Sequence, residues 1–214
     1  AEVIISGNRI NGYLFMASIP GACLRYCQFY LTKAQEAWGH FHQLCFSFFG
    51  GTLDNCIYDN DSVLKNNKTD KPTSFCNELE VHYHFEAIFC NKAAGWEKGS
   101  VENAVGFCRR NLLAGIPEFT SVDVLNGFLE EGCLRTITEE KHYLSERPLC
   151  ELFDELHQKV SPFNKGKTWG KWEDLKVNEF QQIHYQEYGY SVPERYVGFL
   201  LQTFITAFSI DIYD

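Results

Sequence analysis

Gly95-Trp96-Glu97-Lys98-Gly99-Ser100-Val101-Glu102-Asn103 leads directly into Ala104–Leu113 and is the most informative stretch of the chain. Its first part is rich in glycine and predicts a turn, whereas its second part has the spacing of a helix. One face of that helix is apolar: Val101, Val105, Cys108 and Leu112. The adjacent face carries an acid, a residue without a side chain and two guanidinium groups: Glu102, Gly106, Arg109 and Arg110. This face suits metal and phosphate binding, but a surface helix whose charges match its dipole has the same pattern.

The composition indicates a globular protein. The 214 residues are 45% hydrophobic and 15% aromatic, enough for one domain or for a domain with a small appendage. No apolar run approaches the ~20 residues that a membrane span needs, and Ala1–Ser6 lacks the basic leader of a signal peptide. Because the one methionine is Met16, the sequence is expected to begin inside a longer protein.

Cysteines and histidines are the usual ligands of structural zinc, but their spacing here does not favour it. The nine cysteines form no C-x-x-C pair and their number is odd. Most lie in apolar runs such as Gln43–Phe49, so free buried thiols in a reducing cytoplasm are favoured over disulfides or zinc. Two H-x-H pairs lack acidic partners at ligand spacing and are interpreted as ordinary helix residues: His40 with His42, and His82 with His84.

The formal charge of −9 argues against a generic nucleic-acid-binding protein, which usually has a basic excess. The basic residues nevertheless cluster locally, at Lys65–Lys71, at Lys92 and Lys98, at Arg109-Arg110 and at Lys165–Lys171.

The order of predicted elements indicates a mixed α/β fold. Up to the informative stretch the elements are a hairpin of Val3–Ile5 with Tyr13–Ser18, a strand at Leu24–Leu31, a helix capped by Thr32 and Gln35 and ended by Gly50-Gly51, a strand at Asn55–Tyr58, a loop at Lys65–Thr73, a helix at Ser74–His84 and a strand at Phe85–Cys90. This order fits a ribonuclease-H-like sheet with helices on both faces. Two helices, Thr120–Cys133 and Pro148–Val160, a linker at Ser161–Lys171 and several short strands follow.

Asp59 follows directly after the strand Asn55–Tyr58. Catalytic groups in α/β folds lie at the carboxyl ends of strands, so this position suits a catalytic acid. The alternative is an Asx turn that closes the strand, which is the commoner role of an Asp-Asn pair such as Asp59-Asn60.

Several motifs occur in order and at suitable intervals: Phe49-Gly50-Gly51, Ile57-Tyr58-Asp59-Asn60, Phe89-Cys90-Asn91, Glu97–Asn103, Val105-Gly106, Arg109-Arg110-Asn111 and Tyr190-Ser191-Val192-Pro193. In these motifs the chain resembles the IstA-type insertion-sequence transposases, members of the retroviral-integrase superfamily. The resemblance implies an integrase-type catalytic core at residues 1–115, a helical connection at 116–164 and a small DNA-contacting β-barrel at 165–214.

The resemblance also implies the chemistry of a DNA transposase, which cuts and joins phosphodiesters with three carboxylates and two Mg²⁺ or Mn²⁺ ions. Asp59 matches the second acid and Glu102 the third. The first acid lies in the family just before the segment that matches Ala1–Ile5, and Glu2 does not replace it. The chain is therefore expected to be a fragment that is inactive alone.

Basic and amide side chains near these acids are the expected DNA contacts. Lys92, Lys98, Arg109 and Arg110 are candidates for phosphate contacts, and Asn60 and Asn103 for orienting the acids or touching DNA. The partners that the resemblance implies are double-stranded DNA of transposon ends and target, a helper ATPase of the AAA+ class and further copies of the chain. The expected location is the bacterial cytoplasm, on the nucleoid, without membrane contact.

Two alternatives remain open at this point. One is a catalytically dead relic of a transposase that binds DNA or serves in assembly. The other is a metal-dependent nuclease of the same fold that cuts DNA without joining it.

Overall fold

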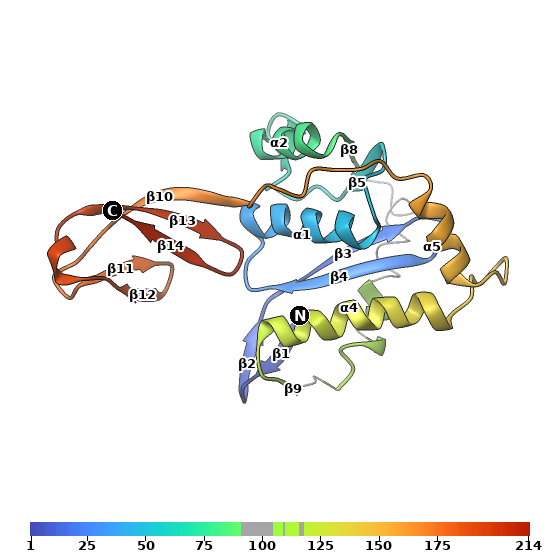
Figure 1. Cartoon of the computed structure of the whole chain (residues 1–214), viewed down its shortest axis with the longest axis horizontal. Helices are drawn as coiled ribbons and strands as arrows, with labels where there is room; N and C mark the ends of the chain where they lie inside the picture. The colour runs from blue at the N-terminus through green and yellow to red at the C-terminus, as the bar shows by residue number, and fades with distance from the viewer. Residues whose placement is uncertain (91–104, 109, 116–117) are drawn as a thin grey trace. The chain divides into compact units, whose positions relative to one another are not determined.

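The computed structural model describes residues 1–90, 105–108, 110–115 and 118–214 (Figure 1). Contacts divide the chain into two compact units, Ala1–Lys167 and Thr168–Asp214. The strands of the first unit are β1 (Glu2–Ile5), β2 (Asn8–Asn11), β3 (Tyr13–Ile19), β4 (Leu24–Tyr30), β5 (Asn55–Tyr58), β6 (Lys65–Asn66), β7 (Lys71–Pro72), β8 (Glu86–Phe89) and β9 (Glu118–Phe119). Its helices are α1 (Gln35–Phe48), α2 (Ser74–Tyr83), α4 (Val122–Glu139) and α5 (Leu149–His157). The first unit is therefore a mixed α/β structure.

The N-terminal hairpin differs from the predicted one. β1 pairs antiparallel with β2, whose register joins Glu2 to Asn11, and β3 pairs instead with β4. The predicted pairing of Val3–Ile5 with Tyr13–Ser18 was wrong because β2 has a polar sequence, Asn-Arg-Ile-Asn, without the alternation that marks a half-buried strand. Among the described residues, β1 is the strand that pairs with β2.

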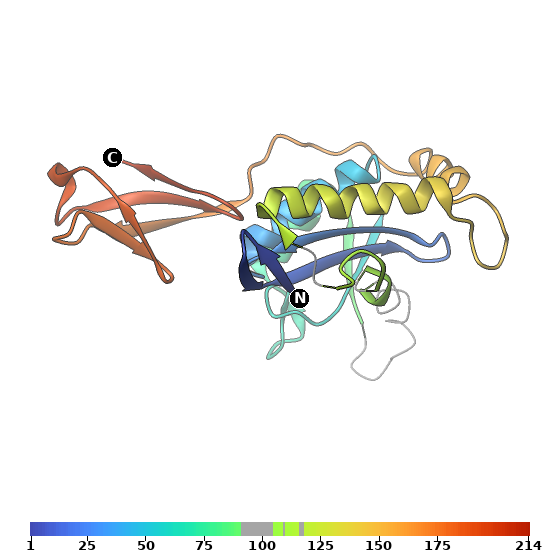
Figure 2. The ribbon, with the colours of Figure 1, turned by 90° about the horizontal axis from the view of Figure 1, so that it is seen from below.

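The β3–β4 hairpin lies between α1 on one face and α4 on the other (Figures 1 and 2). Side chains of β4 alternate between these two layers. Tyr26 stacks on Phe41 of α1, with ring centroids 5.9 Å apart, whereas Cys27 and Phe29 belong to the apolar cluster that includes Leu125 and Leu129 of α4. Because both faces are covered, β4 is a mostly apolar run, and the strand predicted at Leu24–Leu31 is confirmed.

One side chain of α4 hydrogen-bonds to the backbone of β4. Asn126 Oδ1 accepts from the amide of Phe29 at 2.7 Å, and Asn126 Nδ2 donates to the carbonyl of Phe29 at 3.0 Å. Phe29 is fully buried and Asn126 is only 8% exposed. The asparagine thus makes the same two hydrogen bonds that a neighbouring strand residue would make.

The long amphipathic helix α1 is confirmed, but its predicted cap is not. The N-cap is Ala34, and no side chain caps the helix. Thr32 Oγ1 instead accepts a hydrogen bond from the amide of Ala34 at 3.1 Å, a local turn that competes with the capping box. At the other end the backbone leaves the helix through Gly50, whose φ of +81° favours glycine.

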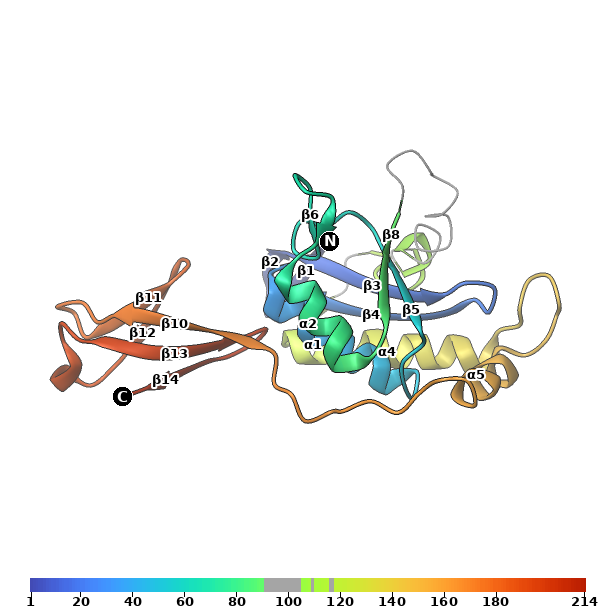
Figure 3. The same ribbon diagram turned by 90° about the horizontal axis from the view of Figure 1, so that it is seen from above.

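β5 and β8 pair in parallel, with Asn55 opposite Glu86 and Tyr58 opposite Phe89 (Figure 3). Between them the chain forms the small hairpin of β6 and β7 and then α2, whose N-cap Thr73 accepts from the amide of Cys76. The segment Lys65–Thr73, predicted as a loop, is therefore ordered by this hairpin. Parallel pairing brings the carboxyl ends of β5 and β8 to the same edge.

The second unit consists of β10 (Gly170–Lys176), β11 (Gln182–Tyr185), β12 (Tyr188–Ser191), β13 (Leu200–Thr206) and β14 (Ile210–Tyr213). They form two antiparallel sheets, β10-β13-β14 and β11-β12, around a small core of Val177, Ile183, Val192 and Leu201. Within this unit no strand pairing closes the sheets into a barrel, so the predicted barrel is not confirmed. The boundaries predicted at residues 115 and 164 remain predictions; α4 and α5 lie in the first unit.

The nine cysteines are thiols and not disulfides, as predicted, and six of them are buried. Three of the buried thiols meet in the first unit, where Cys27 Sγ lies 3.7 Å from Cys133 Sγ and 3.6 Å from Cys108 Sγ. None of the helices in the described ranges combines the length and the apolar character that crossing a membrane requires.

Candidate functional site

Asp59 lies at the carboxyl end of β5, one residue after the last paired position, Tyr58. The residue is exposed, and its Oδ1 accepts a hydrogen bond from the amide of Asn60 at 2.7 Å. This bond is the Asx-type closure of the strand, and it still leaves the carboxylate at the surface. The turn and the functional interpretation of Asp59 are therefore compatible.

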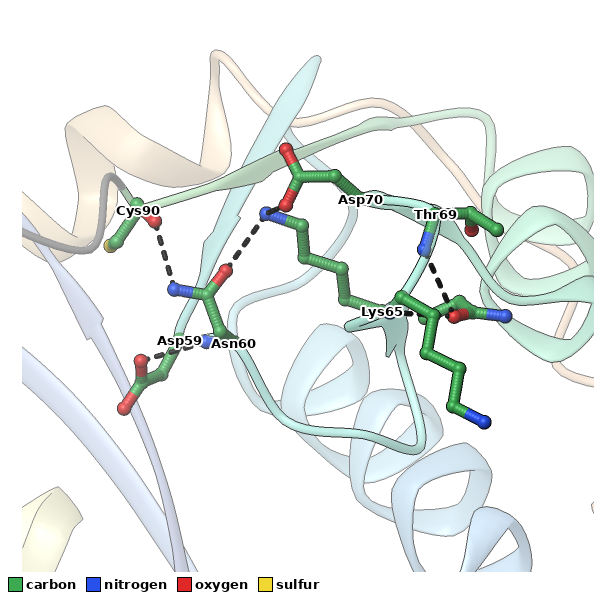
Figure 4. A network of polar contacts seen from close by, with 8 residues as sticks. Asp59, Asn60, Lys65, Thr69, Asp70 and Cys90 are labelled. Carbon is green, nitrogen blue, oxygen red and sulfur yellow. Dashed lines mark hydrogen bonds and ion pairs between the residues drawn. The ribbon is translucent and has the colours of Figure 1, made fainter.

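Asn60 ties the ends of the two parallel strands together (Figure 4). Its Nδ2 donates to the carbonyl of Cys90, the residue after β8, at 3.0 Å. Its Oδ1 accepts from Lys65 Nζ at 2.9 Å. Both ends of the side-chain amide are thus engaged within the fold, which fits a role in positioning Asp59.

Lys65 holds the side chain of Asn60 in place, and this role was not predicted. Its side chain is only 9% exposed, and its ammonium also pairs with Asp70 Oδ1 at 2.9 Å. The same ammonium lies 5.3 Å from the centroid of the Phe89 ring, in cation–π geometry. In the sequence Lys65 looks like one member of an exposed basic cluster, and only its position directly after the apolar pair Val63-Leu64 hints at burial.

An open cleft of about 400 Å³ adjoins the carboxylate and is lined by Lys33, Trp38, Asp59, Asn60, Asp61, Ser62 and Asn67. Asp61 does not offer a second carboxylate of the same kind. Its Oδ2 lies 3.5 Å from Lys33 Nζ, and its Oδ1 accepts from the amide of Val63 at 2.9 Å. Both acids border the cleft, but both carboxylate oxygens of Asp61 are engaged within the turn and with Lys33.

The buried His42 connects α1 to β5. Its Nδ1 lies 2.6 Å from the carbonyl of Trp38, which only accepts, so Nδ1 carries the proton. Its Nε2 then accepts from the hydroxyl of Tyr58 at 2.7 Å. Burial lowers the pKa of His42 to about 4, so the ring is neutral at pH 7. The reading of His42 as a structural helix residue agrees with these contacts.

Arg110 lies on the helical segment that follows the informative stretch, and it is exposed. Its guanidinium folds back over Gly106, where a Cβ atom would lie 2.9 Å from Nη1. Gly106 and Arg110 were predicted to share one helix face, and the missing side chain of Gly106 leaves room there for the guanidinium of Arg110.

The remaining predicted site residues, Lys92, Lys98, Glu102, Asn103 and Arg109, lie outside the described residues. Within the described part of the chain no three His, Cys, Asp or Glu side chains are grouped as a metal site would require. Glu2 pairs with Arg9 at 2.6 Å in the N-terminal hairpin. The site that can be described is therefore one surface carboxylate, Asp59, held by Asn60 and Lys65 beside a cleft.

Comparisons with known proteins relate the chain to transposases, although no family model matches it. The transposase for insertion sequences IS1326/IS1353 of Pseudomonas aeruginosa is 33% identical over 165 residues, which cover 74% of this chain and 32% of that protein. A transposase of Aminobacter aminovorans is 30% identical over 169 residues, or 77% of this chain and 33% of that protein.

Among solved structures, the catalytic core domain of BIV integrase is similar with a TM-score of 0.44 and 12% identity, over 74% of this chain and 93% of that one. The chain spans about a third of the length of the curated relatives that it matches. By sequence, then, about three quarters of this chain is similar to a part of bacterial insertion-sequence transposases.

Proposed function

We propose that this chain is the larger part of the integrase-type catalytic core of an insertion-sequence transposase, with a ribonuclease-H-like fold and the IstA-type motifs. The observation that carries the proposal is the position of Asp59. Within a region similar to transposases, this acid stands at the carboxyl end of a parallel strand and borders a cleft. That is where an α/β fold presents groups for chemistry.

The proposed reaction is cleavage of a DNA phosphodiester followed by joining of a 3′-hydroxyl to target DNA. A pair of Mg²⁺ or Mn²⁺ ions supplies activation of the nucleophile and stabilisation of the leaving oxygen when bound. Asp59 fits such an ion because a surface carboxylate is the oxygen ligand that hard cations prefer. Glu102 and an acid that precedes Ala1 are the proposed remaining ligands.

Asn60 and Lys65 have the role of positioning Asp59. The side chain of Asn60 is fixed by hydrogen bonds with Cys90 and Lys65, and the backbone amide of Asn60 donates to the carboxylate of Asp59. Holding the carboxylate in one orientation lowers the cost of bringing a ligand oxygen to a defined place.

DNA phosphates are the proposed partners of four basic residues, Lys92, Lys98, Arg109 and Arg110, and Asn103 is a further proposed DNA contact. The second unit has three basic and seven acidic residues. We therefore do not expect it to bind DNA through general charge attraction. An AAA+ helper ATPase and further copies of the chain complete the proposed assembly.

Strand transfer by the protein extended at its N-terminus, so that it includes the residues encoded before Ala1, tests the proposal. We expect joining of transposon-end DNA to target DNA with Mg²⁺ or Mn²⁺, with the helper ATPase present. Asp59→Asn should reduce the rate by about 10²–10³ or more, as loss of a placed electrostatic group does.

Asp54→Asn is the matched control, because Asp54 is also exposed and lies just before the opposite end of β5. Its activity should stay near that of the parent. Cleavage without joining would favour a nuclease of the same fold. Equal activities of the Asp54 and Asp59 variants would show that the site is assigned wrongly.

A further inference from the structure

The sheet of β10, β13 and β14 in the second unit has one face against the core and one face that points outward (Figures 1 and 3). Leu201 of β13 belongs to the core of this unit, and Leu175 of β10 and Ile212 of β14 pack against it. Successive side chains of a strand point to opposite faces. The residues next to these three along each strand therefore point outward, and the function proposed above uses none of them.

The strand register arranges six outward side chains in two rows across the sheet: Trp172, Phe204 and Asp211 in one row, and Asp174, Gln202 and Tyr213 in the other. The three aromatic rings converge over this face. The centroid of the Trp172 ring lies 4.9 Å from that of Phe204 and 5.3 Å from that of Tyr213. We refer to these three residues as the aromatic cluster.

The aromatic cluster remains largely open to solvent. Trp172 is 59% exposed and Tyr213 is 47% exposed. Among the described residues, eight of the seventeen large apolar side chains that are exposed belong to the second unit, although this unit has fewer than a quarter of the residues. Contiguous exposed apolar surface marks interaction sites, and tryptophan and tyrosine are the residues that contribute most at such sites.

Two carboxylates lie beside the aromatic cluster, at opposite corners of the two rows. Asp211 stands directly across from Phe204, and Asp174 follows Trp172 by two residues on the same face of β10. Both acids are exposed. Neither carboxylate forms an ion pair or a hydrogen bond with any residue that the structure describes.

The three basic residues of the second unit leave these acids available. Lys171 pairs with Glu173, and Arg195 donates to the hydroxyl of Tyr196. Lys176 points to the outward face but lies one row beyond Asp174. Because the unit also has seven acidic residues, the surface around the aromatic cluster favours a cationic partner.

Arginine matches this combination of rings and carboxylates. Its planar guanidinium stacks on an aromatic ring while its N–H groups donate to a carboxylate. Neighbouring strands lie about 4.8 Å apart and residues i and i+2 about 6.8 Å apart, which places the Cα atoms of Asp174 and Asp211 about 12 Å from each other. Two arginines four residues apart in an extended segment span about 13 Å. Nucleic-acid bases also stack on exposed rings, but the two carboxylates repel the phosphates.

We propose that the aromatic cluster, with Asp174 and Asp211, is a docking site for a partner protein that binds through an extended segment carrying two arginines about four residues apart. The rings stack on the guanidinium groups, and the carboxylates accept from them. The proposal concerns the second unit by itself, and it is independent of the catalytic role of Asp59.

Anisotropy titrations of a labelled peptide with the 214-residue chain test the proposal. The peptide is Gly-Arg-Ser-Gly-Ser-Arg-Gly with blocked ends. We expect Trp172→Ala to weaken its binding by about tenfold or more, as truncation of a central aromatic residue does. Asp174→Asn combined with Asp211→Asn should weaken binding by about threefold or more and reduce its salt dependence. A peptide with citrulline, which has the shape of arginine without the charge, should bind about tenfold more weakly or less.

Two matched control variants should bind the peptide like the parent. Phe180→Ala removes an aromatic side chain that is also exposed but lies outside the strands of this sheet, and Glu187→Gln removes an exposed acid of the same unit. Equal binding of the arginine and citrulline peptides, or an equal loss for Phe180→Ala and Trp172→Ala, would overturn the proposal.

Two further outcomes would assign the surface to another partner. If single-stranded DNA binds in place of the peptide and Trp172→Ala weakens that binding, the aromatic cluster is a base-stacking site. If the chain dimerises and Trp172→Ala abolishes the dimer without any effect on the peptide, the occupant is a second copy of the chain. Both results contradict the proposed arginine-containing partner.

Discussion

Replacing Asn126 by alanine should destabilise the first unit strongly, because this side chain satisfies both backbone groups of a fully buried residue. Phe29 has no exposed surface, so its amide and carbonyl would have no partner in the variant. An unsatisfied buried group costs about 1–3 kcal/mol, so the two together predict a loss of about 2–6 kcal/mol. For a protein of this size, each kcal/mol lowers the Tm by about 2–4 °C.

Helical circular dichroism followed through thermal or urea unfolding measures this change. The α-helices all lie in the first unit among the described residues, so the helical signal reports on that unit. Asn11→Ala, a substitution at an exposed asparagine in β2, is the control and should stay within about 0.5 kcal/mol of the parent.

Asn126→Asp separates the hydrogen bonds from simple packing. The carboxylate has the same size and still accepts from the Phe29 amide, but in its ionised form it cannot donate to the Phe29 carbonyl. Burial and this carbonyl raise the folded pKa of the new acid, so the variant should gain stability relative to the parent as the pH falls. A loss below about 1 kcal/mol for Asn126→Ala, or no relative gain at low pH for Asn126→Asp, would refute the reasoning.

Three further predictions concern the site and its surroundings. Because burial lowers the folded pKa of His42 to about 4 while the unfolded value is about 6.5, the unfolded state binds the proton first; stability should fall by about 2 kcal/mol between pH 7 and pH 5, and urea titrations of His42→Gln should lack this component. Lys65→Met should cost about 1–3 kcal/mol by leaving Asn60 without its donor, whereas Lys68→Met at an exposed position should cost less than about 0.5 kcal/mol in the same urea titration. Arg110→Ala should weaken DNA binding equally for unrelated sequences and reduce the slope of log K against log salt by about 0.9; an unchanged slope in fluorescence titrations would show that this residue does not contact phosphate.

Helices and strands with a strong apolar periodicity could be predicted from the sequence. Elements that are stabilised mainly by pairing with another strand could not. The apolar face of α1 and the apolar run of β4 mark them clearly, because each buries a continuous surface. β2 carries no such signal, since its residues are mostly exposed and its one partner strand holds it. The cap of α1 was missed because Thr32 hydrogen-bonds within its own turn, a choice between two local geometries that the sequence leaves open.

The sequence pointed to Asp59 and Asn60, but it did not show the contacts that hold them. A strand followed by Asp-Asn predicts an acid at a strand end, and the structure places Asp59 there. The interactions of Asn60 with Cys90 and of Lys65 with Phe89 depend on parallel pairing between segments about thirty residues apart. No local pattern encodes such pairing, so Lys65 and the contacts that hold Asn60 become visible only in the fold.

The nine thiols differ in solvent exposure, so their rates of reaction with a thiol reagent report on unfolding of the protein. Cys150 at the start of α5 is exposed, Cys23 and Cys56 are partly covered, and the other six are buried. A thiol reagent should therefore modify one site quickly and two more slowly, and the last six only as the first unit opens. The same difference allows a single dye to be attached at Cys150 without removing any other cysteine, which gives DNA titrations a probe on the native sequence.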